Sequence, residues 1–335
     1  MRGTINLYAS NNDRIGGSFL ILMKISAEGK TGDIGPVGNN SLIVIAAIVF
    51  CLAAASITTM HPDKRNDRQP EGAGYSISRQ IQYSFTLQNN SRQVLQQSQL
   101  WTFAPVKQTA SQLCLNLQSN YPYTLLSDDS GNQVLHFTFE NLAPYASRVV
   151  TIKANLLVSA TANPIPSGPW PRDLNPQKYI ESDHPAINRV AHKLHAADSS
   201  RTIEKVFRWV TGNVRYSGYA GKDRGALYAL EHRKGDCTEY ADLFVALCRA
   251  NGIAARPVGG YVCPQSGILK TRDYHNWGEF YENGTWRLAD PQNRVLMQNT
   301  ADYIAMRIIH ASENDPMGPY NRFRFKGEGL KVTMN

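Results

Sequence analysis

The sequence predicts an α+β fold in which an antiparallel β-sandwich precedes a domain made of a buried helix and an antiparallel sheet. Two observations predict it. Between residues 75 and 160, apolar side chains recur at every second position in short runs separated by turns, which is the pattern of a sandwich. After residue 184 the pattern changes to helical spacing, followed by strand-like runs joined at Asn283-Gly284.

Composition divides the chain into six predicted segments. They are a leader over residues 1–60, a polar linker over 61–74, the β-sandwich over 75–160, a proline-rich connector over 161–183, the helix-and-sheet domain over 184–300, and an extension over 301–335. The prolines of the connector favour an extended, stiff chain. With 335 residues and 42% hydrophobic content, the chain is long enough for two cores besides the leader.

An uncharged apolar run over residues 42–57 marks the leader. It is shorter than the ~20 residues that a membrane-spanning helix needs, and Ala53-Ala54-Ala55 offers small residues for cleavage. It therefore predicts a signal peptide. The alternatives are an uncleaved signal anchor, extended by Thr58-Thr59, and a buried core helix. With a signal peptide or an anchor we expect residues after 60 to be exported to the periplasm or cell envelope, either free or anchored in the inner membrane.

Charge and cysteine usage exclude several classes of protein. The net charge is +8, but no dense Lys/Arg run and no aromatic RNA-binding motif occurs, so we expect no nucleic-acid partner. The five cysteines include no C-x-x-C pair, and no D-x-D-x-D-G calcium loop is present. We therefore expect neither a metal nor a cofactor. A basic surface would suit an anionic cell-wall polymer, although this support is weak.

Cys237 lies at the predicted start of a helix. Asp236 and Glu239 form a capping-box pattern, a long apolar run follows, and Asn251-Gly252 ends it. The positive end of a helix stabilises an anion, so this position favours the thiolate form of Cys237. The nearby backbone N–H groups also suit an oxyanion. The alternative is a small buried apolar residue, which is our interpretation of Cys248 in the same helix.

Asn283-Gly284 predicts a two-residue hairpin loop. In that register residue 282 pairs with 285, and residue 277 pairs with Asp290. Asp290 is then the diagonal neighbour of His275 on the same face of the sheet, within reach at about 7–8 Å between backbones. A three-residue loop would reverse the parity and separate the two side chains.

These groups have the chemistry of nucleophilic acyl transfer. The imidazole takes the thiol proton, and the carboxylate fixes the orientation and tautomer of the imidazole. The sequence therefore predicts Cys237, His275 and Asp290 as a catalytic triad.

Two stretches resemble the transglutaminase-like superfamily over roughly residues 184–295. GDCTEYADLFVALCRANGIAARPVGGY is similar to its nucleophile helix and following strand, and HNWGEFYENGTWRLADP is similar to its histidine and aspartate strands. The resemblance implies a papain-like core and a thiolate–imidazolium pair that acts on amide or ester carbonyls. It also fits exported bacterial members with an N-terminal β-domain. Thr238, Tyr240 and Asn276 depart from the usual pattern, but none of them replaces a triad residue. The family often has an aromatic residue in the stretch that holds Tyr216, which implies an oxyanion donor here; a core tyrosine is the alternative.

The expected function is that of an exported cysteine enzyme that transfers an acyl group through a thioester at Cys237. Hydrolysis, as in a cysteine protease, is favoured over transamidation. The expected substrate is a peptide, a protein or peptidoglycan, with membrane contact only through an uncleaved leader. The alternative is a non-catalytic transglutaminase-like binding module of the cell envelope, which a chemically inert Cys237 would favour.

Overall fold

The structure is a computed structural model, and it describes residues 74–335 except 166–167, 311–315 and 318–321. The predicted leader, with its apolar run over residues 42–57, lies outside the described residues, as does the linker up to residue 73. None of the helices in the described part of the chain combines the length and apolar character needed to cross a bilayer.

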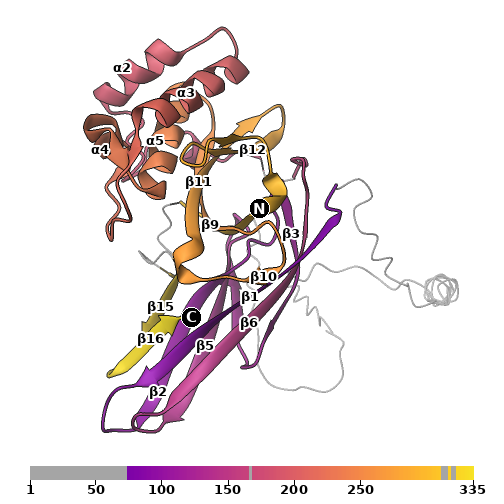
Figure 1. The fold of residues 1–335 in the computed structure, drawn as a ribbon, viewed down its shortest axis with the longest axis vertical. Coiled ribbons are helices and arrows are strands. Elements are labelled where there is room, and N and C mark those ends of the chain that lie inside the picture. The colour runs from indigo at the N-terminus through magenta and orange to yellow at the C-terminus, as the bar shows by residue number, and fades with distance from the viewer. Residues whose placement is uncertain (1–73, 166–167, 311–315, 318–321) are drawn as a thin grey trace, which may run out of the picture. The chain divides into compact units, whose positions relative to one another are not determined.

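Two sheets form the sandwich, and all their pairings are antiparallel apart from one short parallel pair (Figure 1). The strands from the N-terminal part are β1 (Ile77–Asn89), β2 (Leu95–Ala104), β3 (Gln112–Ser119), β4 (Thr124–Ser127), β5 (Gln133–Leu142) and β6 (Ser147–Val158). The orders are β10-β1-β6-β3, with β16 also on β1, and β15-β2-β5-β4. Alternate residues of β1 are buried, as period-two spacing predicts. Tyr83, Leu100 and Phe137 are among the side chains of the shared core.

The second domain places helices against a mainly antiparallel sheet of order β13-β12-β11-β9-β14. Its helices are α2 (Pro185–Leu194), α3 (Ser199–Asn213), α4 (Gly225–His232) and α5 (Cys237–Ala250). Its strands are β7 (Arg215–Tyr216), β8 (Lys234–Gly235), β9 (Ala255–Val262), β11 (Tyr274–Glu282), β12 (Thr285–Asp290), β13 (Val295–Leu296) and β14 (Tyr303–Ile308). Short 3₁₀ turns cover Pro171–Asp173, Thr271–Asp273 and Thr300–Asp302. The predicted α+β fold, with antiparallel sheets before the helix-and-sheet domain, is confirmed.

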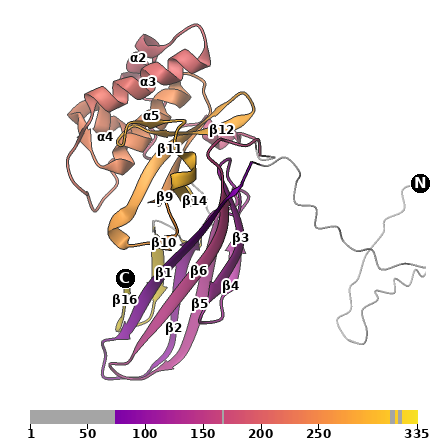
Figure 2. The same cartoon turned by 45° about the vertical axis from the view of Figure 1, so that its right-hand side comes forward.

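The buried helix α5 packs on β11, as Figures 1 and 2 both show. Phe244 of the helix and Phe280 of the strand meet edge-to-face, with ring centroids 6.2 Å apart. The β11–β12 hairpin has the predicted register, since Glu282 lies opposite Thr285. Its loop residue Asn283 has a positive φ of 49°, and Gly284 follows at 78°, as a two-residue type I′ loop requires.

Residues 301–335, predicted only as an extension, contribute strands to both domains. β14 joins β9 in the sheet of the helix-containing domain. β15 (Phe323–Lys326) pairs with β2, and β16 (Leu330–Met334) pairs with β1 in the sandwich. In both views these yellow strands lie beside the sandwich strands. The segment therefore links the two domains.

The connection from β9 to β11 also contacts the sandwich. Its strand β10 (Gly267–Ile268) runs parallel to β1, with Gly267 opposite Ile81. Leu269 follows, donating its N–H to Gln82 O at 2.8 Å, and its side chain is only 3% exposed within the sandwich core. This anchor fixes the chain a few residues before His275, so the sandwich takes part in positioning β11.

We expect Leu269→Ala to lower the free energy of unfolding by about 2–5 kcal/mol, because a buried leucine leaves a cavity in a packed core. The adjacent Ile268 is 63% exposed. Ile268→Ala is therefore the matched control, with an expected change within about 0.5 kcal/mol. Urea denaturation followed by fluorescence measures both. Equal effects of the two substitutions would contradict the anchoring role of Leu269.

Candidate active site

Cys237 is the first residue of α5, and hydrogen bonds fix the start of this helix. The Asp236 side chain accepts a bond from Thr238 N at 2.9 Å, and Glu239 Oε2 accepts one from Asp236 N at 2.9 Å. This is the capping box predicted from the sequence. Among the described residues no group accepts a hydrogen bond from the N–H of Cys237, so this donor is available beside the half-buried sulfur.

Glu239 is itself held in place from two sides. Arg224 Nη2 forms an ion pair with Glu239 Oε2 at 2.7 Å, and the side chain of Glu239 is 1% exposed. On the other side, a Cβ at Gly235 would lie 2.4 Å from Glu239 Cβ, so only glycine fits there without movement. These contacts leave the start of α5 little freedom to shift.

His275 and Asp290 meet as the hairpin register predicts. His275 Nε2 lies 2.7 Å from Asp290 Oδ2, and the Asp290 side chain is 1% exposed. Three further donors reach the same carboxylate: Asn293 N at 3.1 Å, Asn293 Nδ2 at 2.8 Å and Tyr303 Oη at 2.9 Å. Hydrogen-bond donors therefore compensate the buried charge of Asp290.

The pKa values of this pair follow from burial and mutual attraction. Burial alone lowers the pKa of His275, but the hydrogen bonds and charges of Asp290 and Cys237 outweigh it and raise the pKa to about 9. Burial alone raises the pKa of Asp290, and its bond to His275 is the main contact that holds it below the usual value. Burial, and then Asp290, raises the pKa of Tyr303, which therefore remains a hydroxyl donor.

The start of α5 lies against the start of β11, and this contact brings Cys237 to His275. Cys237 and His275 line the same cavity, and Cys237 is one of the groups that raise the pKa of His275. Beside it, Asn276 Nδ2 donates to Thr238 Oγ1 at 2.9 Å. Further along the strand, Gly278 has no space for a side chain, because a Cβ would lie 2.7 Å from Phe244. The helix can therefore approach the strand closely enough for the thiol to reach the ring.

Cys237 and His275 line a cavity of about 690 Å³. Tyr216 lines the same cavity from β7, whose partner strand β8 ends two residues before Cys237. The tyrosine is 56% exposed. It is thus near the nucleophile and accessible from the cavity, which leaves its predicted role as an oxyanion donor open to test.

Two residues that support Asp290 were not identified from the sequence. Asn293 follows β12 by three residues and closes a turn around the carboxylate. Tyr303 lies on β14, outside the stretch that carries the motifs. A polar residue shortly after the Asp290-Pro291 strand end was a local signal for Asn293. No local signal existed for Tyr303, because its contact depends on how β14 pairs with β9.

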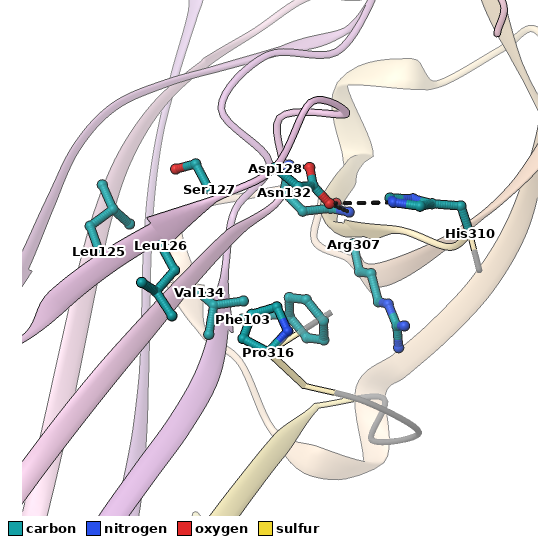
Figure 3. A pocket seen from close by; sticks show the side chains of 10 residues that line it. All are labelled: Phe103, Leu125, Leu126, Ser127, Asp128, Asn132, Val134, Arg307, His310 and Pro316. Carbon is teal, nitrogen blue, oxygen red and sulfur yellow. Dashed lines mark hydrogen bonds and ion pairs between the residues drawn. The ribbon is translucent and has the colours of Figure 1, made fainter. Parts of the chain in front are cut away.

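A second cavity, of about 400 Å³, contains none of the triad residues (Figure 3). At its rim His310 Nε2 lies 3.5 Å from Asp128 Oδ2, and Asp129 completes a group of suitable size for a metal ion. Each carboxylate is already engaged, since Asp128 accepts from Ser130 N and Asp129 pairs with Arg172. These contacts explain the two carboxylates as part of the turn that joins β4 to β5.

Comparison with known proteins identifies a transglutaminase-like domain. Residues 188–291 match the family described as the transglutaminase-like superfamily. An uncharacterised protein of Mycobacterium leprae (strain TN) is 27% identical over 128 residues, which are 37% of this chain and 44% of that protein. The chain thus matches less than half the length of this relative.

Solved structures with some likeness come from two further bacteria. A candidate cysteine protease from Cytophaga hutchinsonii has a TM-score of 0.49 and 19% identity, covering 77% of this chain and 92% of that one. The periplasmic domain of TgpA from Pseudomonas aeruginosa, bound to ethylmercury, has a TM-score of 0.34 and 16% identity, covering 66% of this chain and 92% of that one.

We expect His275 to lose its proton near pH 9 rather than near the ordinary histidine value of about 6.5. The protonated form should therefore persist through neutral pH and disappear as the pH rises through 9. Asp290→Asn removes the main stabilising charge, so the pKa of His275 should fall. NMR titration of ¹⁵N-histidine-labelled protein, with His275→Gln to assign the signal, measures this. An unchanged pKa in Asp290→Asn would contradict the assigned coupling.

Proposed function

We propose that this chain, which carries a transglutaminase-like domain at residues 188–291, is a cysteine enzyme that transfers acyl groups through a thioester at Cys237. The observation that supports this most directly is that the Cys237 thiol shares a cavity with an imidazole whose Nε2 lies 2.7 Å from Asp290 Oδ2. A thiol, an imidazole and a carboxylate in this order are the groups that such chemistry requires.

In the first half-reaction the thiolate of Cys237 attacks the carbonyl carbon of an amide. Asp290 engages Nε2 of His275, so Nδ1 is the ring nitrogen that exchanges a proton with the thiol. The carbonyl π electrons move to oxygen and form an oxyanion. When the C–N bond breaks, the imidazolium of His275 gives its proton to the leaving amine, and the acyl group remains on sulfur as a thioester.

In the second half-reaction a nucleophile resolves the thioester. A water attacks the acyl carbon, gives its proton to the now neutral His275, and displaces the thiolate to leave a carboxylic acid. An amine in place of water would give transamidation. We favour hydrolysis of a peptide or isopeptide in protein or peptidoglycan. The apolar run over residues 42–57 and the net charge of +8 support an exported enzyme that acts on an anionic cell envelope.

Two donors are proposed for the oxyanion. The free N–H of Cys237 points from the first turn of α5, where the helix dipole also favours negative charge. The second is the Tyr216 hydroxyl, which reaches the same cavity from β7.

We expect iodoacetamide near neutral pH to alkylate Cys237 ahead of the other described cysteines. Burial raises the pKa of Cys114, Cys248 and Cys263, which keeps those thiols protonated. Peptide mapping by mass spectrometry locates the adduct. His275→Ala should slow the reaction of Cys237 by roughly 10²-fold or more, because the proton acceptor is lost.

Cys263→Ser is the matched control, since Cys263 is a partly exposed cysteine that does not line the Cys237 cavity; it should leave the labelling rate unchanged. The same protein is then incubated with peptides and peptidoglycan fragments, and an acyl adduct on Cys237 is sought. An added amine that appears in the product would favour transamidation over hydrolysis. An unreactive Cys237 would contradict the enzymatic proposal and favour a binding module.

We expect Tyr216→Phe to lower kcat by roughly 10²–10³-fold with little change in KM, because an oxyanion donor acts mainly in the transition state. Tyr219 lines the same cavity and is 77% exposed, so Tyr219→Phe provides the control. Steady-state kinetics with any substrate that acylates Cys237 gives both constants. Equal rates for the two variants would remove Tyr216 from the site.

A further inference from the structure

One wall of the Cys237 cavity is built by a residue from the far end of the described chain. Arg322 lines this cavity together with Thr271 and Tyr274. It directly precedes β15, so it belongs to the sandwich rather than to the residues 188–291 that match the transglutaminase-like family. The cleft over the nucleophile is therefore shared between the two domains.

Arg322 is held in a defined position within this wall. Its Nη1 donates to Thr271 O at 2.9 Å, and its guanidinium carbon lies 5.5 Å from the centre of the Tyr274 ring. Its backbone carbonyl accepts a bond from Phe103 N at 3.3 Å. Among the described residues, the Arg322 side chain donates only to Thr271 O, so several of its five N–H groups stay available to a ligand.

Three carboxylates, Asp223, Asp236 and Asp273, line the cleft, and each already has a partner. Asp236 accepts bonds from Ala220 N and Thr238 N, both at 2.9 Å. Asp273 lies 3.6 Å from Arg272. Among the residues that the structure describes, no ion pair includes Arg322. The Arg322 guanidinium thus lines the cavity in a fixed position, held by the Thr271 carbonyl and the Tyr274 ring.

We propose that Arg322 binds a carboxylate of the substrate, so that the Cys237 cleft prefers acyl donors carrying a negative charge near the reacting carbonyl. The planar guanidinium matches a carboxylate with two parallel hydrogen bonds, and a cleft shields the pair from solvent. Tyr274 and Thr271 fix the guanidinium before the ligand arrives, which reduces the entropy lost on binding. This inference rests on the proposed acyl-transfer function, and it names acidic peptides as the substrate class.

The test compares two alkylating reagents of nearly equal size on the full chain. Iodoacetate carries a carboxylate and iodoacetamide carries a neutral amide, and both react at the Cys237 sulfur. We expect the rate ratio of iodoacetate to iodoacetamide at Cys237 to fall by roughly three- to tenfold in Arg322→Ala, because one cation near the sulfur is removed. Arg322→Gln, which keeps the stem and a donor, should lower the ratio similarly.

Arg324→Ala is the matched control. Arg324 lies two residues further on, with its guanidinium carbon 4.2 Å from the centre of the Trp101 ring, and it does not line the cavity. The ratio in this variant should equal that of the wild type. Thermal denaturation verifies folding, and Arg322→Gln replaces Arg322→Ala where the latter unfolds.

The outcomes separate the two proposals. If neither reagent modifies Cys237, the acyl-transfer function fails and the Arg322 proposal fails with it. If both reagents modify Cys237 but the ratio is the same in wild type, Arg322→Gln and Arg324→Ala, the preference for anionic substrates is overturned and the acyl-transfer function stands.

Discussion

The arrangement of the site depends on one contact, the packing of the α5 N-terminus against the start of β11. The capping box of Asp236 and Glu239 fixes where the helix begins, and Arg224 fixes Glu239. Gly278 allows the helix to come close to the strand, since a Cβ there would meet Phe244 at 2.7 Å. A sulfur at the positive end of a helix and an imidazole bonded to a buried carboxylate then line the same cavity.

Two of the three residues that depart from the family pattern, Thr238 and Asn276, take part in this same contact. Thr238 follows Cys237, and Asn276 follows His275, so each stands directly after a proposed catalytic residue. The two are joined by a hydrogen bond of 2.9 Å between Asn276 Nδ2 and Thr238 Oγ1. The departures therefore form a matched pair that ties the helix to the strand, which explains how both are accommodated beside the thiol and the imidazole.

Features set by local chemistry were predictable from the sequence. The capping box defined the start of α5, and Asn283-Gly284 defined the hairpin register that brings Asp290 next to His275. Features that depend on contacts distant in sequence were not. Tyr303 reaches Asp290 only because β14 pairs with β9, and Arg322 reaches the cleft only because β15 joins the sandwich. Periodicity identifies a strand but not its partner, so neither residue carried a signal of its role.

The pairing of β16 with β1 has a consequence for how the molecule is assembled. Thr86 and Asn335 are joined by a hydrogen bond across 249 positions of sequence, and strands Ile77–Asn89 and Leu330–Met334 form one ladder. Closing so large a loop is slow, because chain entropy is lost before the pairing can compensate for it. The nucleophile helix can fold from neighbouring segments well before this ladder closes. During biosynthesis, the Cys237 thiol should therefore be present for a time before Arg322 reaches the cleft. The proposed selection of substrates would then begin only once the sandwich is complete.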